Sequence, residues 1–185
     1  NGIAVDQASN CYITGAYRNT ATFGTTSFTS AGNYDIFVAK YDSNGNFIWA
    51  QSAGGTGDDR GQSISVDVAG NCYLTGFFKS TFTIATNTIT SAGDSDIFLA
   101  KYNTSGIAQW AKRAGGSGSD EGNSIKVAAA GNIYVTGYFT DTATFDTATL
   151  VGYGNTDIFA AKYDFKGDLI WVKKYGGTQN DKGYG

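Results

Sequence analysis

The stretch Asp35-Ile-Phe-Val-Ala-Lys-Tyr41 decides the fold, because the chain contains it three times with almost no change. It returns as Asp96–Tyr102 and Asp157–Tyr163, each time 61 residues further along the 185-residue chain. Apolar side chains follow one another within it, without the alternation that marks a strand with one face in water. The stretch is therefore predicted to be a β-strand that is covered on both faces.

The rest of the sequence keeps the same period. The pattern Asn-x-Tyr-x-Thr-Gly recurs at residues 10–15, 71–76 and 132–137. The copies align without a gap, and we place them at residues 1–61, 62–122 and 123–183. Residues 184–185 match the opening of a fourth copy, and the chain contains no methionine, so we expect it to be a piece of a longer array.

Each copy is predicted to contain four antiparallel strands and no helix. In the second copy the strands are expected at residues 63–68, 71–78, Asp96–Tyr102 and 107–112. Gly106, like Gly45 and Gly167, stands where a tight turn between strands needs a positive φ. A Thr-rich excursion separates the second and third strands, and we expect it to form a small additional hairpin.

Four-stranded sheets repeated in tandem are typical of β-propeller blades. The fold class is thus predicted as all-β, with three propeller blades. They would form a segment of a larger propeller, or half of a propeller completed by a second chain. A β-trefoil, which closes with three four-stranded units, is the alternative, and a β-prism is a further one.

The motifs themselves resemble a known family. The run Asp-Ile-Phe-x-Ala-Lys-Tyr, a Gly turn, Trp, Gly-Gly-(Thr/Ser)-x-x-Asp-x-Gly and Asn-x-Tyr-x-Thr-Gly is similar to the bacterial SBBP repeats, of the seven-bladed β-propeller type. The resemblance covers nearly the whole chain. It implies a secreted or cell-surface protein, located outside the bacterial cell.

Composition excludes several kinds of chemistry. The chain has no histidine, which removes Ser-His-Asp triads, Cys-His pairs and histidine metal sites. A net charge of −3 argues against a nucleic-acid partner, and no apolar run is long enough to span a membrane. Cys11 and Cys72 occupy equivalent positions that hold isoleucine in the third copy, so we predict two free, buried thiols.

In a blade, the Thr-rich excursions and the glycine-acid loops lie at the same end of the sheets, which we call the loop face. It comprises residues 18–34, 79–95, 140–156, 54–61, 115–122 and 176–183. Binding residues tend to lie on loops that a rigid scaffold holds. The loop face is therefore the predicted site.

Acidic residues recur in the glycine-acid loops. The candidates for ligand binding, and for a Ca²⁺ ring, are Asp58, Asp59, Asp120, Glu121 and Asp181. The alternative is structural, with each carboxylate accepting backbone N–H bonds where the chain crosses between blades. We favour the structural interpretation and predict no cofactor.

Aromatic residues divide into recurring and unique positions. Trp49, Trp110 and Trp171 recur and are expected to pack between sheets, while Asp35, Asp96 and Asp157 are expected to bind loop backbone. Tyr34 and Tyr153 do not recur, which makes them candidates for ligand contact.

The functional prediction is a non-catalytic extracellular module that serves as a scaffold, an adhesin or a protein-binding surface. The alternatives are a lectin-like glycan-binding module and a glycosidase that uses paired carboxylates. The repeat argues against an enzyme, because an active site is usually one unique cleft. The expected partners are a protein or a glycan at the cell surface, and further repeats or a second chain that closes the propeller.

Overall fold

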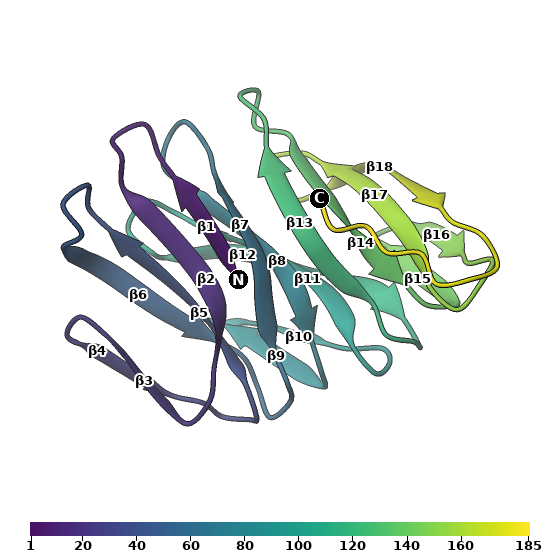
Figure 1. The fold of residues 1–185 in the computed structure, drawn as a ribbon, viewed down its shortest axis with the longest axis horizontal. Coiled ribbons are helices and arrows are strands. Elements are labelled where there is room, and N and C mark those ends of the chain that lie inside the picture. The colour runs from purple at the N-terminus through teal and green to yellow at the C-terminus, as the bar shows by residue number, and fades with distance from the viewer.

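The computed structural model describes all of residues 1–185 and consists of β-strands, turns and loops without a helix. The strands form antiparallel sheets, and most recur with the 61-residue spacing of the sequence (Figure 1). We call the three successive four-stranded groups units 1, 2 and 3. Unit 1 comprises β1 (Gly2–Val5), β2 (Cys11–Tyr17), β5 (Asp35–Tyr41) and β6 (Phe47–Ala53).

Units 2 and 3 repeat this order. Unit 2 comprises β7 (Arg60–Val66), β8 (Cys72–Phe78), β11 (Asp96–Tyr102) and β12 (Ala108–Gly116). Unit 3 comprises β13 (Glu121–Val127), β14 (Ile133–Phe139), β17 (Asp157–Tyr163) and β18 (Leu169–Tyr175). The structure confirms the third strand of each copy at the predicted residues.

Each excursion forms a two-stranded hairpin, as expected. The hairpins are β3 (Thr20–Phe23) with β4 (Thr26–Thr29), β9 (Thr81–Ile84) with β10 (Asn87–Thr90), and β15 (Thr142–Phe145) with β16 (Ala148–Val151). In the turns between third and fourth strands, Gly45, Gly106 and Gly167 have φ values of 81°, 77° and 84°. These left-handed values are ones that glycine adopts without steric cost.

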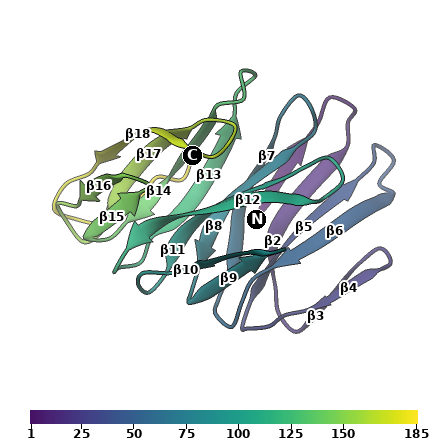
Figure 2. The same ribbon diagram turned by 180° about the vertical axis from the view of Figure 1, so that it is seen from behind.

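The hairpin of unit 3 attaches to the sheet of unit 2, which the sequence did not predict. Strand β15 pairs with the end of β12 through Ala114 with Phe145 and Gly116 with Ala143. The result is one six-stranded sheet in the order β16-β15-β12-β11-β8-β7, seen from behind in Figure 2. Strand β12 therefore extends to Gly116, beyond the predicted end at residue 112. In the same way, the backbone of Gly54 in unit 1 forms an isolated antiparallel β-bridge with Thr83 of the unit 2 hairpin.

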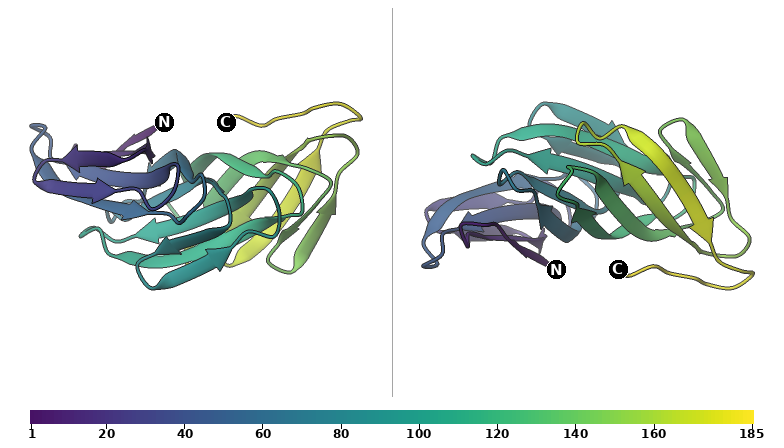
Figure 3. Two further views of the ribbon diagram at one scale, coloured as in Figure 1. Left: turned by 90° about the horizontal axis from the view of Figure 1, so that it is seen from below. Right: turned by 90° about the horizontal axis from the view of Figure 1, so that it is seen from above.

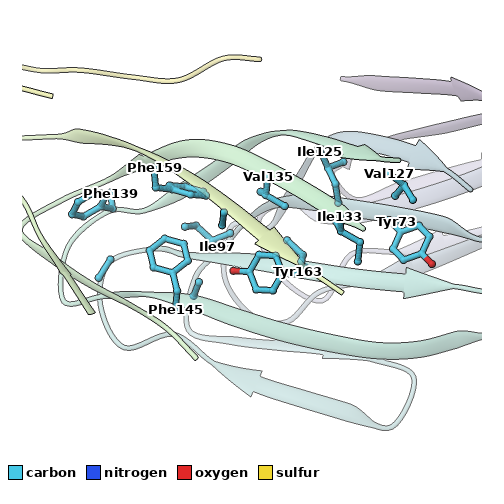
Figure 4. Packing of buried hydrophobic residues seen from close by; sticks show 14 residues of the cluster. Tyr73, Ile97, Ile125, Val127, Ile133, Val135, Phe139, Phe145, Phe159 and Tyr163 are labelled. Carbon is cyan, nitrogen blue, oxygen red and sulfur yellow. The ribbon is translucent and has the colours of Figure 1, made fainter. Parts of the chain in front are cut away.

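The apolar core lies between units and not within them. One cluster joins residues of units 1 and 2, and the other joins residues of units 2 and 3. Figure 4 shows the second cluster, in which Tyr73 and Ile97 of unit 2 lie with Ile125, Phe145 and Phe159 of unit 3. The continuous apolar runs of the sequence are explained by this covering of both faces of unit 2.

The three units follow one another with unit 2 in the middle, and both termini lie on the same side of the molecule (Figure 3). The structure shows neither a closed propeller ring nor a closed trefoil. Both cysteines are free, but only Cys72 is fully buried, whereas Cys11 is half-buried. The prediction of two buried thiols is therefore wrong for Cys11: the equivalent Cys72 packs against unit 1, and none of the three units lies on that side of unit 1.

The hairpin contact between units predicts a difference between two equivalent phenylalanines. Phe145 is fully buried, and its ring centre lies 4.8 Å from that of Phe159. Phe23 is half-buried, and its ring centre lies 4.6 Å from that of Phe37. We expect Phe145→Ala to lower the free energy of unfolding by about 3–5 kcal/mol, the usual cost of truncating a buried phenylalanine. Phe23→Ala should cost clearly less, and urea denaturation measures both. Equal losses would contradict the stabilising role of the contact between units.

Candidate functional site

The aspartates of the glycine-acid loops join each unit to the next. The Asp59 carboxylate accepts the Gly55 N–H of its own loop at 2.8 Å and the Lys79 N–H of unit 2 at 3.1 Å. Its own backbone N–H donates to the Tyr34 carbonyl at 2.9 Å. Asp59 therefore fixes the crossing between units 1 and 2 with hydrogen bonds to the backbone on both sides.

Asp120 repeats this arrangement one unit later. Its carboxylate accepts the Gly116 N–H at 2.7 Å and the Thr140 N–H of unit 3 at 2.8 Å. Asp181 keeps only the first of these bonds, from Gly177 at 2.7 Å. The three equivalent residues thus differ in whether a following unit supplies the second donor.

Burial makes two of these carboxylates unusual acids. Asp59 and Asp120 are fully buried, and burial raises the pKa of Asp59 to about 7 and that of Asp120 to about 6. The backbone N–H bonds oppose this shift in both residues, and the nearby Asp35 or Asp96 adds to it. The charge of Arg113 also lowers the pKa of Asp120, which explains part of the difference between the pKa values of Asp59 and Asp120.

The other acidic candidates point to different partners. Asp58 binds Arg60 through two hydrogen bonds of 3.0 and 3.2 Å, and the guanidinium lies 4.4 Å from the centre of the Tyr34 ring. Glu121 belongs to β13, and its proximity raises the pKa of Tyr138 further, after burial. No group of three or more His, Cys, Asp or Glu side chains converges on a point where a metal ion would bind.

The aspartates that open the third strands contact the excursions. Asp35 accepts the Ala31 N–H at 3.1 Å, and Asp157 accepts the Tyr153 N–H at 2.8 Å. Asp96 accepts the Ala92 N–H and also binds Arg113. These carboxylates hold the loop face in shape.

One carboxylate oxygen, Oδ1 of Asp157, is buried without a hydrogen-bond partner. In unit 2 the equivalent oxygen of Asp96 accepts the Ser91 hydroxyl at 2.9 Å. Residue 152 is glycine where the other copies have serine, so the third copy lacks this donor.

Two unique tyrosines lie on the loop face, each beside a cation. Tyr34 is half-buried under the Arg60 guanidinium, whereas Tyr153 is 68% exposed with the Lys174 ammonium 3.2 Å from its ring centre. They belong to units 1 and 3, so unit 2 separates them. The sequence motifs did not indicate the two cations. A departure from the repeat could have indicated Lys174, because the equivalent positions of the other copies hold Ser52 and Arg113.

The tryptophans lie at the faces where units meet. Trp49 forms an edge-to-face pair with Tyr12, with ring centres 6.1 Å apart, and the pairs Tyr73–Trp110 and Tyr134–Trp171 repeat it. The first two pairs are covered by the following unit. Tyr134 and Trp171 are each 38% exposed.

Comparison with known proteins supports a repeat architecture. No protein-family model matches the chain. The chain is 32% identical over 184 residues to an uncharacterised WD repeat-containing protein, L264, of Acanthamoeba polyphaga mimivirus. It is 27% identical over 161 residues to the regulatory protein FlaEY of Caulobacter vibrioides.

These alignments cover 87% and 81% of this chain, but the chain spans only 13% and 16% of the two proteins. Neither similarity tests the resemblance to SBBP repeats, which stays a prediction. The structure has no helix with the length and hydropathy needed to pass through a bilayer.

The raised pKa values predict an unusual dependence of stability on pH. An aspartate with a raised pKa binds its proton more tightly in the folded than in the unfolded chain, where the pKa is near 3.8. The free energy of unfolding should therefore fall as the pH rises from about 4 to about 7.

The double variant Asp59→Asn with Asp120→Asn removes both buried acids. Its free energy of unfolding should fall less between these pH values, and urea denaturation across this pH range measures the change. The control is Asp181→Asn, at the equivalent but half-exposed position, which should keep the slope of the unmodified protein. A slope unchanged in the double variant would contradict the assignment to these two carboxyls.

Proposed function

We propose that this chain is a non-catalytic, propeller-type repeat module that binds a protein partner through its loop face. The mimivirus relative is named as a WD repeat protein, and repeats of that kind form propeller blades. The four-stranded antiparallel units stacked in chain order agree with such blades. Closure into a ring with further units belongs to the same proposal.

A binding role is supported by how the recurring polar groups are used. Asp59 and Asp120 are buried and each accept two backbone N–H groups, and Asp58 is paired with Arg60. A general acid or nucleophile needs a carboxylate with access to a substrate. The fully buried pair lacks this access, which favours a scaffold over an enzyme.

The observation that carries the proposal is the exposed Tyr153 with Lys174 against its ring. Tyrosine offers a large, rigid contact area with a polar tip, and it is enriched among the residues that dominate protein interfaces. The excursion that bears Tyr153 is held by Asp157, so the ring is presented on an ordered loop. A partner would gain this contact at little cost in ordering the loop.

We also propose display outside the cell, as a scaffold or adhesion module of a bacterial surface or secreted protein. The support is the resemblance to SBBP repeats together with the acidic composition, with pI about 4.7 and 26 glycines.

Affinity capture with immobilised variants tests the binding role. The unmodified chain, Tyr153→Ala and Phe165→Ala would each be exposed to extract and culture fluid of the source cells, and retained proteins quantified by mass spectrometry. We expect at least one protein to be retained about tenfold less by Tyr153→Ala, since truncating an interface anchor costs more than 1 kcal/mol. Phe165 is a matched control, because it is also exposed in unit 3 but lies on the turn between β17 and β18.

Three results would contradict the proposal. Equal retention by all variants would remove the role of Tyr153. Binding to a glycan array that Tyr153→Ala abolishes would favour a lectin. Hydrolysis of a polysaccharide that Asp58→Asn abolishes would establish a glycosidase.

A further inference from the structure

A hollow of about 290 Å³ lies between units 1 and 2. Gln51 of β6 lines it from unit 1, and Tyr102, Ile107 and Ala108 line it from unit 2. Ala85, in the turn between β9 and β10, lines it as well. The two units stack directly on each other, so the hollow is part of an internal interface. None of the side chains that line it is charged.

The equivalent place between units 2 and 3 has no such hollow. An ion pair between Lys112 and Asp168, with 3.2 Å between Nζ and Oδ1, spans that interface. Leu169 adds a large apolar side chain, which packs against the core cluster of units 2 and 3. The positions of Gln51, Ala85, Ile107 and Ala108 correspond to those of Lys112, Asp146, Asp168 and Leu169. The hollow thus results from side chains that break the repeat in a stacking contact that keeps it.

Tyr102 brings a hydrogen-bond donor without a partner to this hollow. The residue is 3% exposed, and its hydroxyl forms no hydrogen bond with another group of the chain. A buried tyrosine hydroxyl usually has such a partner. Burial raises the pKa of Tyr102, so the hydroxyl keeps its proton at neutral pH and can donate it to an acceptor.

The equivalent tyrosine shows where this hydroxyl points. In unit 3 the charge of Asp146 raises the pKa of Tyr163 further, after burial, so the hydroxyl lies near the turn of the excursion hairpin. In unit 2 the same turn holds Ala85, which has no acceptor on its side chain. The Tyr102 hydroxyl is therefore directed into the hollow, toward a place where unit 3 has a carboxylate.

Ala85 itself has an unusual backbone conformation. Its φ is 52°, in the left-handed region that is costly for alanine. The equivalent residues, Gly24 and Asp146, have φ values of 56° and 54° and belong to types that adopt this region more readily. Backbone strain of this kind often occurs at binding sites. Alanine at this position keeps the hollow open at a conformational cost.

We propose that the hollow between units 1 and 2 binds a small uncharged ketone or ester with an apolar body. The Tyr102 hydroxyl would donate to the carbonyl oxygen, and the apolar body would pack on Ile107 and Ala108. A charged ligand is disfavoured, because no charged side chain lines the hollow to pair with it. This site is independent of the partner proposed for the loop face.

The volume limits the size of the ligand. An apolar cavity of about 150 Å³ is large enough for benzene. The hollow has about twice this volume, which suits one ring with a short carbonyl substituent. Para-fluoroacetophenone has this composition, and its fluorine atom makes it a convenient probe.

Titration followed by fluorine NMR tests the proposal. We expect saturable binding of para-fluoroacetophenone with a dissociation constant of about 1 mM or lower, as for an efficient ligand of this size. Para-fluorotoluene lacks the carbonyl oxygen and should bind about three- to tenfold more weakly, the usual value of one hydrogen bond. Para-fluorobenzoate, which is charged, should show no saturable binding.

Two tyrosine variants test the proposed hydrogen bond. Tyr102→Phe removes only the hydroxyl, so it should weaken binding of the ketone about three- to tenfold and leave that of para-fluorotoluene unchanged. The hydroxyl has no partner in the chain, so circular dichroism should show an unchanged fold. Tyr163→Phe is the matched control at the equivalent position of unit 3, and it should bind the ketone like the unmodified chain.

A third variant closes the hollow with residues that the chain itself uses. Ala85→Asp with Ala108→Leu gives unit 2 the side chains of Asp146 and Leu169. The carboxylate would compete for the Tyr102 hydroxyl, and the leucine would occupy the apolar part. Aspartate also tolerates the left-handed backbone, so the fold should be kept while binding of the ketone is lost.

Three results would overturn the proposal. One is the absence of saturable ketone binding up to about 10 mM, which is too weak for a built site of this size. Another is ketone binding that Tyr102→Phe does not weaken, or that Tyr163→Phe weakens equally. The third is binding that persists in the Ala85→Asp, Ala108→Leu variant, which would place the probe elsewhere on the molecule.

Discussion

Each unit of this protein carries apolar side chains on both faces of its sheet, and only a neighbouring unit removes them from water. The tyrosine of the second strand shows this directly, because Tyr12 is buried and Tyr134, in the same local sequence, is partly exposed. The difference between them is the presence of a following unit. Burial of such surface is the main favourable term in folding, so stacking provides the core that no unit builds alone.

The polar groups at the crossings serve the same stacking. A buried carboxylate is costly unless hydrogen bonds satisfy it, and Asp59 and Asp120 each obtain one donor from their own loop and one from the next unit. The raised pKa values record the cost that remains after these bonds form. Specific hydrogen bonds thus set the register in which the less directional apolar contacts are made.

The period of the sequence predicted what is local to one copy, and it could not predict what passes between copies. The strand Asp96–Tyr102 and the glycine turns were found because a continuous apolar run and turn chemistry are local properties. The pairing of β15 with β12 joins residues of different copies and leaves no periodic signal. For the same reason the loop-face tyrosines were identified, but the cations beside them were not. The exposure of Trp171 depends on the place of its unit in the stack.

In a repeat protein, structural residues can be distinguished from functional ones on physical grounds. A side chain that all three units need for stacking occurs three times. Its hydrogen bonds or contacts are then made with the neighbouring unit. Residues that break the period are free of this demand, and Tyr153 with Lys174 stands out among them on the loop face. Binding by this molecule is therefore expected at the unique positions of its loops.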